Sequence, residues 1–404
     1  MRTIRWAPRG GPKGAAEPID PTDAGRRDGF AAGGGGADAV PPGSGPDGDG
    51  SGRLTRGNKT VLGVFFGLLI VLVIGSLVHL PYAIESPGPT INTLGEQDLN
   101  GKPTPLIVVS GLPTYPTDGS LKFTTVRIQG GPGYPVDLWD VLGAWLDPAR
   151  DVSPVADVFD PNASKEQVAE QNTVQMQGSQ QEATAVALRA IGKPVPTYIV
   201  IAAFTPTSKA KDVLKVNDRL ESVSGTKVTG VDSVRSALSS VKPGDPVKMV
   251  VIRAGKPVPV SAPTIEGQNG GAALGVLLGV DHDFPAKITI NAGAVGGPSA
   301  GLMFSLGIYD TLTPGALTGD HQIAGTGTID DDANVGPIGG IAQKMVGARD
   351  GGADYFLAPA DNCTDVVGNI PDGLQVFKVS TFDQAEAAVE AIAKGQTGGL
   401  ARCT

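Results

Sequence analysis

A serine in a glycine- and proline-rich segment is the first residue of this sequence whose surroundings suggest chemistry. Ser299 follows Gly296-Gly297-Pro298 and precedes Ala300-Gly301. Because proline is favoured in the first turn of a helix, Ser299 is expected at a helix N-terminus, where free N–H groups and the helix dipole favour negative charge. Such donors would stabilise a tetrahedral oxyanion beside Ser299. The alternative is that Ser299 only caps the helix, which is a common role of serine.

A lysine 45 residues further along the chain could supply a base for that serine. Gly339-Gly340 precedes a helical pattern in which Ile341, Met345 and Ala348 share one face. Lys344 lies beside this apolar face, where burial would lower the pKa of its amine and favour the neutral form. A neutral amine can accept the proton of a serine hydroxyl. The alternative is a lysine whose carbon chain covers apolar surface while its amine reaches water.

The two segments together resemble the proteolytic domain of the Lon peptidase family, which uses a Ser–Lys dyad and needs no histidine. The resemblance covers about 130 residues and includes the segment AGTGTI over 324–329. It implies that Ser299 is the nucleophile, that Lys344 is the general base and that Thr326 is a partner of the lysine. Further candidates for supporting the dyad or holding the oxyanion are Gly297, Pro298 and Ala300. No metal ligand and no cofactor is assigned.

The sequence departs from that family in one respect. Lon proteins carry an ATPase that unfolds their substrates, whereas this sequence contains no Walker A motif. The nearest segment, 52–60, has one residue too many and lies in a basic stretch. We therefore expect an ATP-independent enzyme whose substrates are unstructured segments or exposed termini.

A second resemblance lies upstream of the serine. The segment VLKVNDRLESVSGTKV, followed by PGDPVKMVVIRAGK, resembles a PDZ domain over about 70 residues. PDZ domains bind an extended peptide, often a C-terminus, by strand addition. The usual glycine-rich carboxylate loop is not evident, because residues 205–208 read TPTS. The alternative is a small β-domain that acts only as a spacer.

An uncharged apolar run lies near the N-terminus. Residues 61–80 contain no Asp, Glu, Lys or Arg, and a helix of this length, about 30 Å, matches the hydrocarbon core of a bilayer. We therefore predict a transmembrane helix over 59–81; a buried core helix and a cleaved signal peptide are the alternatives. Because Arg53, Arg56 and Lys59 precede the run, the N-terminus is expected in the cytoplasm and the catalytic domain outside. This organisation, and the segment 85–90, resemble a bacterial family of membrane-anchored, PDZ-containing Lon-like peptidases.

The composition fits several folded domains and argues against other classes of protein. The 404 residues are 40 % hydrophobic and 18 % charged, which is enough apolar material for real cores. A net charge of −9 argues against nucleic-acid binding. Two cysteines and three histidines leave little room for a zinc site. Residues 1–58 are rich in glycine and proline and are predicted to be a disordered tail.

Other patterns are weaker candidates for chemistry. Ser208 and Lys211 form a Ser-x-x-Lys pattern without its companion motifs. His321 lies between Ser299 and Lys344 in the sequence and could touch the site, but a structural or surface histidine is expected. The acidic run 330–332 is typical of a solvated loop rather than a cation site. Cys363 and Cys403 would both lie outside the cytoplasm, where a disulfide is allowed; two free thiols are the alternative.

We therefore predict an α+β multidomain protein with one transmembrane helix, a β-rich region, a PDZ-like domain and a Lon-type proteolytic α/β domain. The expected divisions are a cytoplasmic tail over 1–58, the transmembrane helix over 59–81, a β-rich outer region ending in a helix over 82–192, the PDZ-like domain over 193–265, the Lon-type domain over 266–396 and a C-terminal tail over 397–404. The predicted function is that of an ATP-independent, membrane-anchored serine endopeptidase that cleaves extracytoplasmic proteins or peptides. The alternative is a catalytically inactive, membrane-tethered binding or scaffold protein. The resemblance also implies a homo-oligomer, because Lon-type domains commonly form rings, and neither nucleic acid nor ATP is expected as a partner.

Overall fold

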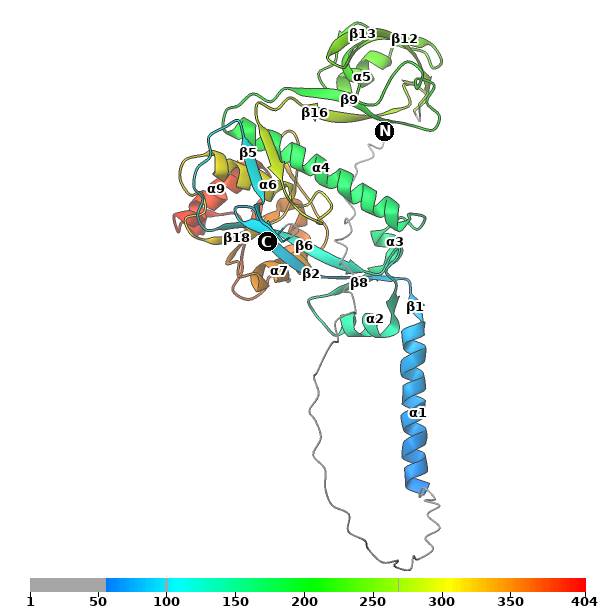
Figure 1. The fold of residues 1–404 in the computed structure, drawn as a ribbon, viewed down its shortest axis with the longest axis vertical. Coiled ribbons are helices and arrows are strands. Elements are labelled where there is room, and N and C mark those ends of the chain that lie inside the picture. Colours follow the sequence, from blue (N-terminus) through cyan, green and yellow to red (C-terminus); the bar gives the residue numbers. More distant parts are fainter. Residues whose placement is uncertain (1–55, 99–100, 268) are drawn as a thin grey trace, which may run out of the picture.

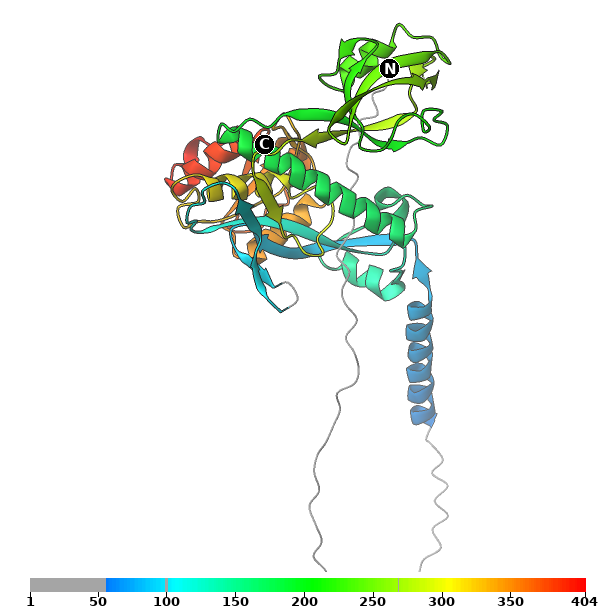
Figure 2. The same ribbon diagram turned by 45° about the horizontal axis from the view of Figure 1, so that its top comes forward.

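The computed structural model describes residues 56–98, 101–267 and 269–404. This part of the chain forms a helix that stands apart, a body built on one six-stranded sheet, and a smaller β-rich module at the end opposite that helix (Figures 1 and 2). The predicted tail over 1–58 lies, but for its last three residues, outside the described residues.

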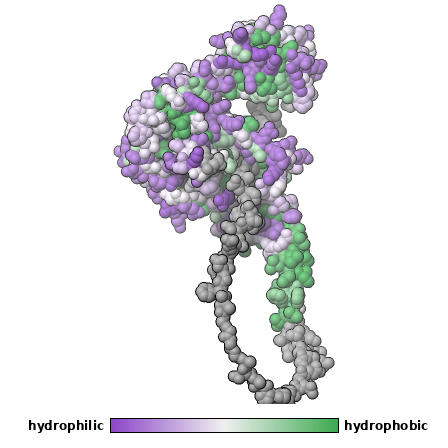
Figure 3. Space-filling view, viewed as in Figure 1, coloured by the Kyte–Doolittle hydropathy of each residue, from purple (hydrophilic) through white to green (hydrophobic). Residues whose placement is uncertain are grey.

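Helix α1 covers Arg56–Leu77, and its described apolar side chains are exposed (Figure 3). The helix ends at Leu77 rather than continuing to residue 81, because His79–Leu80 form strand β1 and pair with Val136–Asp137, strand β7. Within the residues that the structure describes, no helix has both the length and the apolar character needed to cross a bilayer. The transmembrane helix predicted over 59–81 is therefore not confirmed.

The body is built on a sheet with the strand order β22-β21-β18-β6-β2-β8. Strand β6 lies near its centre, with β18 parallel on one side and β2 antiparallel on the other. The strands are β2 (Tyr82–Asn92), β6 (Ser120–Gln129), β8 (Asp151–Pro154), β18 (Gln322–Gly325), β21 (Tyr355–Pro359) and β22 (Gln375–Val379). The sequence divides 82–192 from 266–396, but the structure joins both regions in this one sheet. The pairing of β6 with β18 is the physical link between them.

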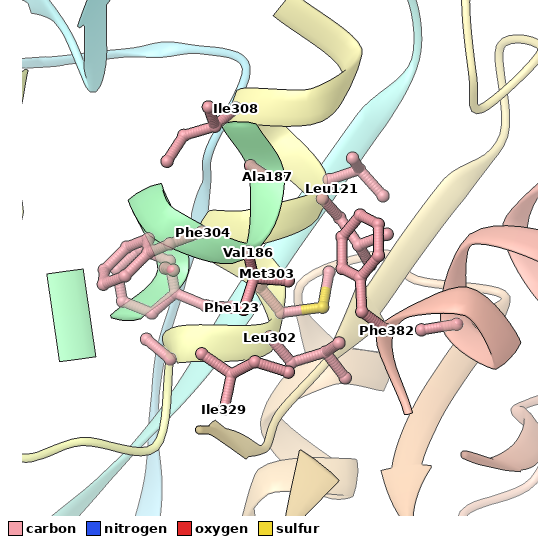
Figure 4. Close-up of a cluster of buried hydrophobic side chains, with 14 of the residues drawn as sticks. Leu121, Phe123, Val186, Ala187, Leu302, Met303, Phe304, Ile308, Ile329 and Phe382 are labelled. Atoms are coloured by element: carbon pink, nitrogen blue, oxygen red, sulfur yellow. The ribbon is translucent and has the colours of Figure 1, made fainter. Parts of the chain in front are cut away.

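Helices cover both faces of this sheet because its parallel strands are apolar on both sides. One face packs against α4 (Lys165–Ala190), α6 (Gly301–Leu312) and α9 (Phe382–Ala393). The other face packs against α7 (Ile341–Asp350) and α8 (Cys363–Val366). Neighbouring strand residues alternate between the faces, as Ile323 and Ala324 do. Figure 4 shows the first cluster, in which Phe123 of β6 contacts Phe304 of α6 at a ring distance of 5.2 Å.

Helix α4 begins after Ser164 and lies against α6. Ser164 and Gln167 form a capping box, in which each side chain accepts the backbone N–H of the other residue. The buried face of the helix includes Asn172, Met176 and Ser179. In contrast, Val174 of the same helix is 60 % exposed.

Residues 197–282 form the smaller module, which is inserted between α4 and the next strand of the body, β17 (Lys287–Ile290). Its sheet has the order β13-β12-β10-β9-β16, with β11 beside β10, and encloses its own core with helix α5 (Val231–Leu238). The strands are β9 (Thr197–Phe204), β10 (Arg219–Val223), β11 (Thr226–Lys227), β12 (Pro246–Arg253), β13 (Lys256–Pro263) and β16 (Val276–His282). Because β16 pairs with β9, the module extends to His282, past the expected boundary at 265.

Short elements complete the described fold. The strand pairs are β3 (Glu96–Asp98) with β4 (Pro103–Pro105), β5 (Ile107–Ser110) with β17, β14 (Ile265–Glu266) with β15 (Ala272–Ala273), and β19 (Thr328–Ile329) with β20 (Val335–Gly336). The short helices are α2 (Leu138–Trp145), α3 (Val155–Val158) and the 3-10 turns η1 (Ala360–Asn362) and η2 (Thr397–Gly399). A disulfide joins Cys363 to Cys403 and fastens the C-terminal tail to the body.

Candidate active site

Ser299 lies in the loop that leads into α6, and helix α4 forms two hydrogen bonds with this loop. The N–H of Gly297 donates to the carbonyl of Asn172 at 3.1 Å. The hydroxyl of Ser179 donates to the carbonyl of Pro298 at 3.0 Å. Gly297 has a φ of +84°, a backbone conformation that favours glycine. Gly297 and the two hydrogen bonds with α4 therefore fix the backbone conformation next to Ser299.

Lys344 lies in the first turn of α7. Gly340, the second glycine of the Gly339-Gly340 pair, directly precedes this helix. Gly340 is the N-cap in the left-handed region, with a φ of +65°. A Cβ on Gly340 would lie 2.7 Å from Cγ1 of Val126 and 2.9 Å from Oε2 of Glu85. The absence of a side chain thus lets α7 begin directly against β2 and β6, with Lys344 2 % exposed.

Ser299, Lys344 and Thr326 meet in one hydrogen-bond network. Nζ of Lys344 lies 2.9 Å from Oγ of Ser299 and 3.1 Å from Oγ1 of Thr326. The Thr326 hydroxyl donates its proton to the carbonyl of Ser299 at 3.0 Å. Toward Lys344 the threonine can therefore only accept. The lysine donates one proton to Thr326, and the lone pair of its neutral form is left to face the Ser299 hydroxyl.

The environment of Lys344 favours that neutral form. Burial lowers the pKa of its amine to about 7, and the nearby charge of Glu85 opposes the shift. Desolvation penalises the charged ammonium because the buried site stabilises a charge less well than bulk water does. The amine is therefore poised to take up and release a proton near neutral pH.

Two backbone N–H groups beside Ser299 remain for an oxyanion. The N–H of Gly301 donates to Pro298 and the N–H of Leu302 donates to Gly327, so the first N–H groups of α6 are occupied. The N–H groups of Ser299 and Ala300 have no acceptor among the described residues. The N-terminal end of a helix adds a favourable dipole for negative charge at this place. Ala300, a predicted oxyanion candidate, thus lies where it can act through its backbone.

A cavity of about 390 Å³ opens beside the dyad. Its wall includes six consecutive residues of β6, Phe123–Ile128. The parallel partner β18 pairs with β6 only at Ser120–Phe123, so the edge of β6 beyond Phe123 has β2 on one side and the cavity on the other. The apolar residues of the wall are Ile91, Phe123, Val126, Ile128, Met176, Ala292, Ala294, Val295, Ala300 and Ile338. The cavity therefore combines one open edge of β6, which β18 does not pair, with apolar surface next to Ser299.

The weaker sequence candidates lie away from this network. His321 contacts the ring of Tyr355 edge-on at 5.5 Å and does not line the cavity. Ser208 and Lys211 belong to the inserted module, where the Ser208 hydroxyl donates to the carbonyl of Leu274. Among the described residues no group of histidine, cysteine and acidic side chains is arranged to hold a metal ion.

Sequence reasoning did not assign three groups that surround the dyad. Glu85 of β2 lines the cavity and acts on the charge of Lys344. Gln97 of β3 also lines it, and its Nε2 atom is buried without a hydrogen-bond partner among the described residues. Met176 reaches the cavity from α4. The only signal for Glu85 was the likeness of segment 85–90 to the family, and no local pattern marks the other two.

The comparison with family models decides what kind of domain this site belongs to. The model of the Lon protease (S16) C-terminal proteolytic domain matches residues 280–392, which include Ser299, Thr326 and Lys344. Residues 280–392 are a Lon-type proteolytic domain. The Lon resemblance that the sequence suggested is confirmed.

A PDZ family model matches residues 174–264 and confirms the second resemblance. The match begins within α4 and ends before β16, whereas the structure closes this module over 197–282. The PDZ domain of the SdrC-like protein from Listeria monocytogenes is 20 % identical, covers 20 % of this chain and 86 % of its own, and has a TM-score of 0.19. The PDZ assignment therefore depends on the family model, and we call residues 197–282 the PDZ domain.

The curated relatives that this region matches are Lon proteases. Lon protease 1 of Sorangium cellulosum is 37 % identical over 135 residues, which are 30 % of this chain and 16 % of the relative. The Lon protease of Azospirillum brasilense is 35 % identical over 123 residues, 26 % of this chain and 15 % of the relative. Lon protease 2 of Bacillus subtilis is 32 % identical over 102 residues, 25 % of this chain and 17 % of the relative. The chain spans less than a fifth of each of these relatives.

Proposed function

We propose that this protein is an ATP-independent serine endopeptidase in which Ser299 is the nucleophile and Lys344 the general base. The observation that carries the proposal is the 2.9 Å distance between Nζ of Lys344 and Oγ of Ser299, at a lysine whose pKa burial lowers to about 7. A buried neutral amine within hydrogen-bond reach of a serine hydroxyl is the pairing that nucleophilic catalysis needs.

The reaction follows from this geometry in two halves. As Oγ of Ser299 attacks a peptide carbonyl, its proton passes to Nζ of Lys344, and the N–H groups of Ser299 and Ala300 bind the developing oxyanion. The lysine then gives the proton to the leaving amine, the C–N bond breaks, and an acyl-enzyme remains. In the second half Lys344 takes a proton from water, which attacks the ester, and returns it to Oγ of Ser299.

The cavity supports an extended peptide as substrate. A peptide that adds to the open edge of β6 at Thr124–Ile128 would form main-chain hydrogen bonds and pass beside Ser299. Its side chains would meet mostly apolar surface, and the unpartnered Nε2 of Gln97 could donate to a substrate carbonyl. Because this mode requires an extended chain, folded proteins would be cleaved only at unstructured segments.

The PDZ domain offers a second place where such a chain can add. Its sheet has two edges, β13 and β16. Strand β13 carries Pro257 and Pro259, which have no N–H to donate, so this edge is poorly suited to strand addition. Strand β16 contains no proline and is the edge suited to bind a peptide. We propose that it holds protein substrates near the proteolytic domain.

Location and assembly are proposals that follow from the sequence. The disulfide between Cys363 and Cys403 supports an extracytoplasmic location, because disulfides persist in oxidising compartments. Attachment to a membrane and assembly into a homo-oligomer stay predictions. Flotation of the full chain with lipid vesicles tests attachment, and light scattering of the detergent-solubilised protein tests assembly.

The decisive experiment compares cleavage of unfolded casein by four purified proteins. The parent should cleave casein and react, even if slowly, with a fluorophosphonate probe. Ser299→Ala and Lys344→Met should abolish cleavage, with unchanged circular dichroism. Ser208→Ala, which alters the serine of the Ser-x-x-Lys pattern in the PDZ domain, should keep full activity. An inactive parent would instead favour the alternative of a binding or scaffold protein, and cleavage by pure Ser299→Ala would refute the assignment of the nucleophile.

A further inference from the structure

The carboxylate of Asp331 holds both ends of the PDZ domain. The chain enters this domain at Thr197 and leaves it at His282, and these two residues are paired across β9 and β16. The Thr197 hydroxyl donates to Oδ2 of Asp331 at 3.2 Å, and Nε2 of His282 lies 2.6 Å from Oδ1. Because a carboxylate only accepts, Nε2 of His282 carries the hydrogen. The first residue of β9 and the last of β16 therefore meet on a single side chain of the proteolytic domain.

Arg189, at the end of α4, binds the same carboxylate from the body. Its guanidinium donates to Oδ1 of Asp331 at 2.9 Å and to the backbone carbonyl of Asp331 at 2.7 Å. It also donates to the Thr197 hydroxyl at 2.6 Å. Since that hydroxyl receives a proton from Arg189, its own proton is free for Asp331. Arg189 and Thr197 can therefore both donate to the Asp331 carboxylate without competing for the same proton.

Burial and charge make this network stronger than a surface ion pair. The side chain of His282 is 1 % exposed and stacks on Phe284 at a ring distance of 5.3 Å, while Asp331 is 30 % exposed. Burial alone would raise the pKa of Asp331, but the hydrogen bonds from Arg189 and His282 outweigh it and lower that pKa. Asp331 is therefore a carboxylate at neutral pH, and partial burial protects its bonds from solvent screening.

A short segment of chain connects Asp331 to the catalytic residues. Strand β19 lies directly before the acidic run, and its first residue, Thr328, lines the cavity. The N–H of Gly327 donates to the carbonyl of Ser299 at 2.9 Å, and Thr326 bonds Lys344. A shift of the Asp331 loop would therefore be transmitted along 326–329 to the network around the dyad.

We infer that Asp331 is a positioning residue that fixes the PDZ domain on the proteolytic domain and couples its orientation to strand β19. A peptide that adds to β16 would lie along the strand that ends at His282, so its binding is expected to act on this carboxylate. The kinetic part of this inference rests on the proposed peptidase function, but the positioning part does not.

The first test measures the orientation of the PDZ domain in a full-length chain that carries Ser299→Ala. Lys256→Cys on β13 and Gln396→Cys on the body carry a fluorophore pair, while the native cysteines are held in their disulfide. Asp331→Asn places an amide among donors and should broaden the distribution of inter-dye distances. It should also speed hydrogen exchange of the amides over 326–329. Asp332→Asn, an exposed neighbour, is the matched control and should change neither.

The second test measures kinetics with unfolded casein in the Ser299 parent. Asp331→Asn should lower kcat by about two- to thirty-fold and leave KM nearly unchanged, the range expected for coupling through a network. If Asp331→Asn fails to fold, Thr197→Val with His282→Phe removes the PDZ side of the network alone and should broaden the distance distribution. A folded Asp331→Asn chain with parental distances and exchange would overturn the inference. Altered distances and exchange in a chain that never cleaves casein would uphold the positioning role and reject only the peptidase proposal.

Discussion

The hydroxyl of Thr326 lies 3.0 Å from the carbonyl oxygen of Ser299, the residue whose own hydroxyl faces Lys344. This contact commits the threonine proton and fixes the direction of the hydrogen bonds around the lysine. It also links the segment after β18 to the loop before α6, as does the N–H of Gly327, which donates to the same carbonyl. The dyad is therefore held by a third side chain that contacts both of its members.

Peptidase activity should rise with pH through about 7 and then level off. Burial lowers the pKa of Lys344 to about 7, so below that pH the amine is protonated and cannot accept the serine proton. We expect kcat/KM for a fluorogenic peptide to fall about tenfold for each pH unit below the pKa. A profile that keeps rising to pH 10 would show that the lysine titrates as an ordinary surface amine and would contradict its role.

Removal of the Thr326 hydroxyl should weaken catalysis without destroying the fold. Thr326→Val keeps the shape of the side chain but loses the bond to the Ser299 carbonyl and the acceptor for Lys344. We expect kcat to fall about ten- to a hundredfold, because the buried amine of Lys344 loses its acceptor and is left partly unsatisfied. Thr326→Ser keeps the hydroxyl and should restore most of the activity. Equal kcat values for the valine and serine variants would show that the Thr326 hydroxyl does not contribute to catalysis.

Alanine at Gly340 should be far more costly than alanine at a glycine of the same conformation. Gly340 and Gly395 have φ values of +65° and +66°, but only at Gly340 would a Cβ meet neighbouring atoms. Gly395→Ala should lower the free energy of unfolding by about 1 kcal/mol, the cost of a left-handed alanine. Gly340→Ala should lower it by about a further 1–3 kcal/mol through overpacking against Val126 and Glu85. Urea unfolding of both variants measures the difference, and equal costs would contradict the close approach of α7 to β6.

Loss of the disulfide should lower stability but leave the catalytic site intact. Cys363 and Cys403 are separated by 40 residues, and closing such a loop stabilises the folded chain by about 4 kcal/mol in the chain-entropy model. Cys363→Ser with Cys403→Ser should therefore unfold at a markedly lower temperature. Its kcat at 25 °C should match that of the parent, because neither cysteine lines the cavity. Unchanged thermal unfolding, compared with and without reductant, would show that the tail is held by its other contacts.

The sequence by itself determined the local elements and the identity of the reacting groups. The helices that begin after Ser299 and after Gly340 follow from short-range patterns, because helix starts depend on a few neighbouring residues. Ser299 and Lys344 stood out because their glycine-rich surroundings resemble one family at a fixed spacing. The sequence predicts 82–192 and 266–396 as separate regions, whereas the structure joins them in one sheet. No local pattern reveals that β6 pairs with a strand about 200 residues away.

Tertiary structure alone decided what surrounds those groups. It brought Glu85 and Gln97 to the cavity from the first strands of the body, and Met176 from the middle of α4. It also placed Asp331, which reads as part of a solvated acidic run, on Arg189, Thr197 and His282. These contacts join residues that lie about 50 to 260 positions apart, so they depend on how whole elements pack and not on the residues beside them in the chain.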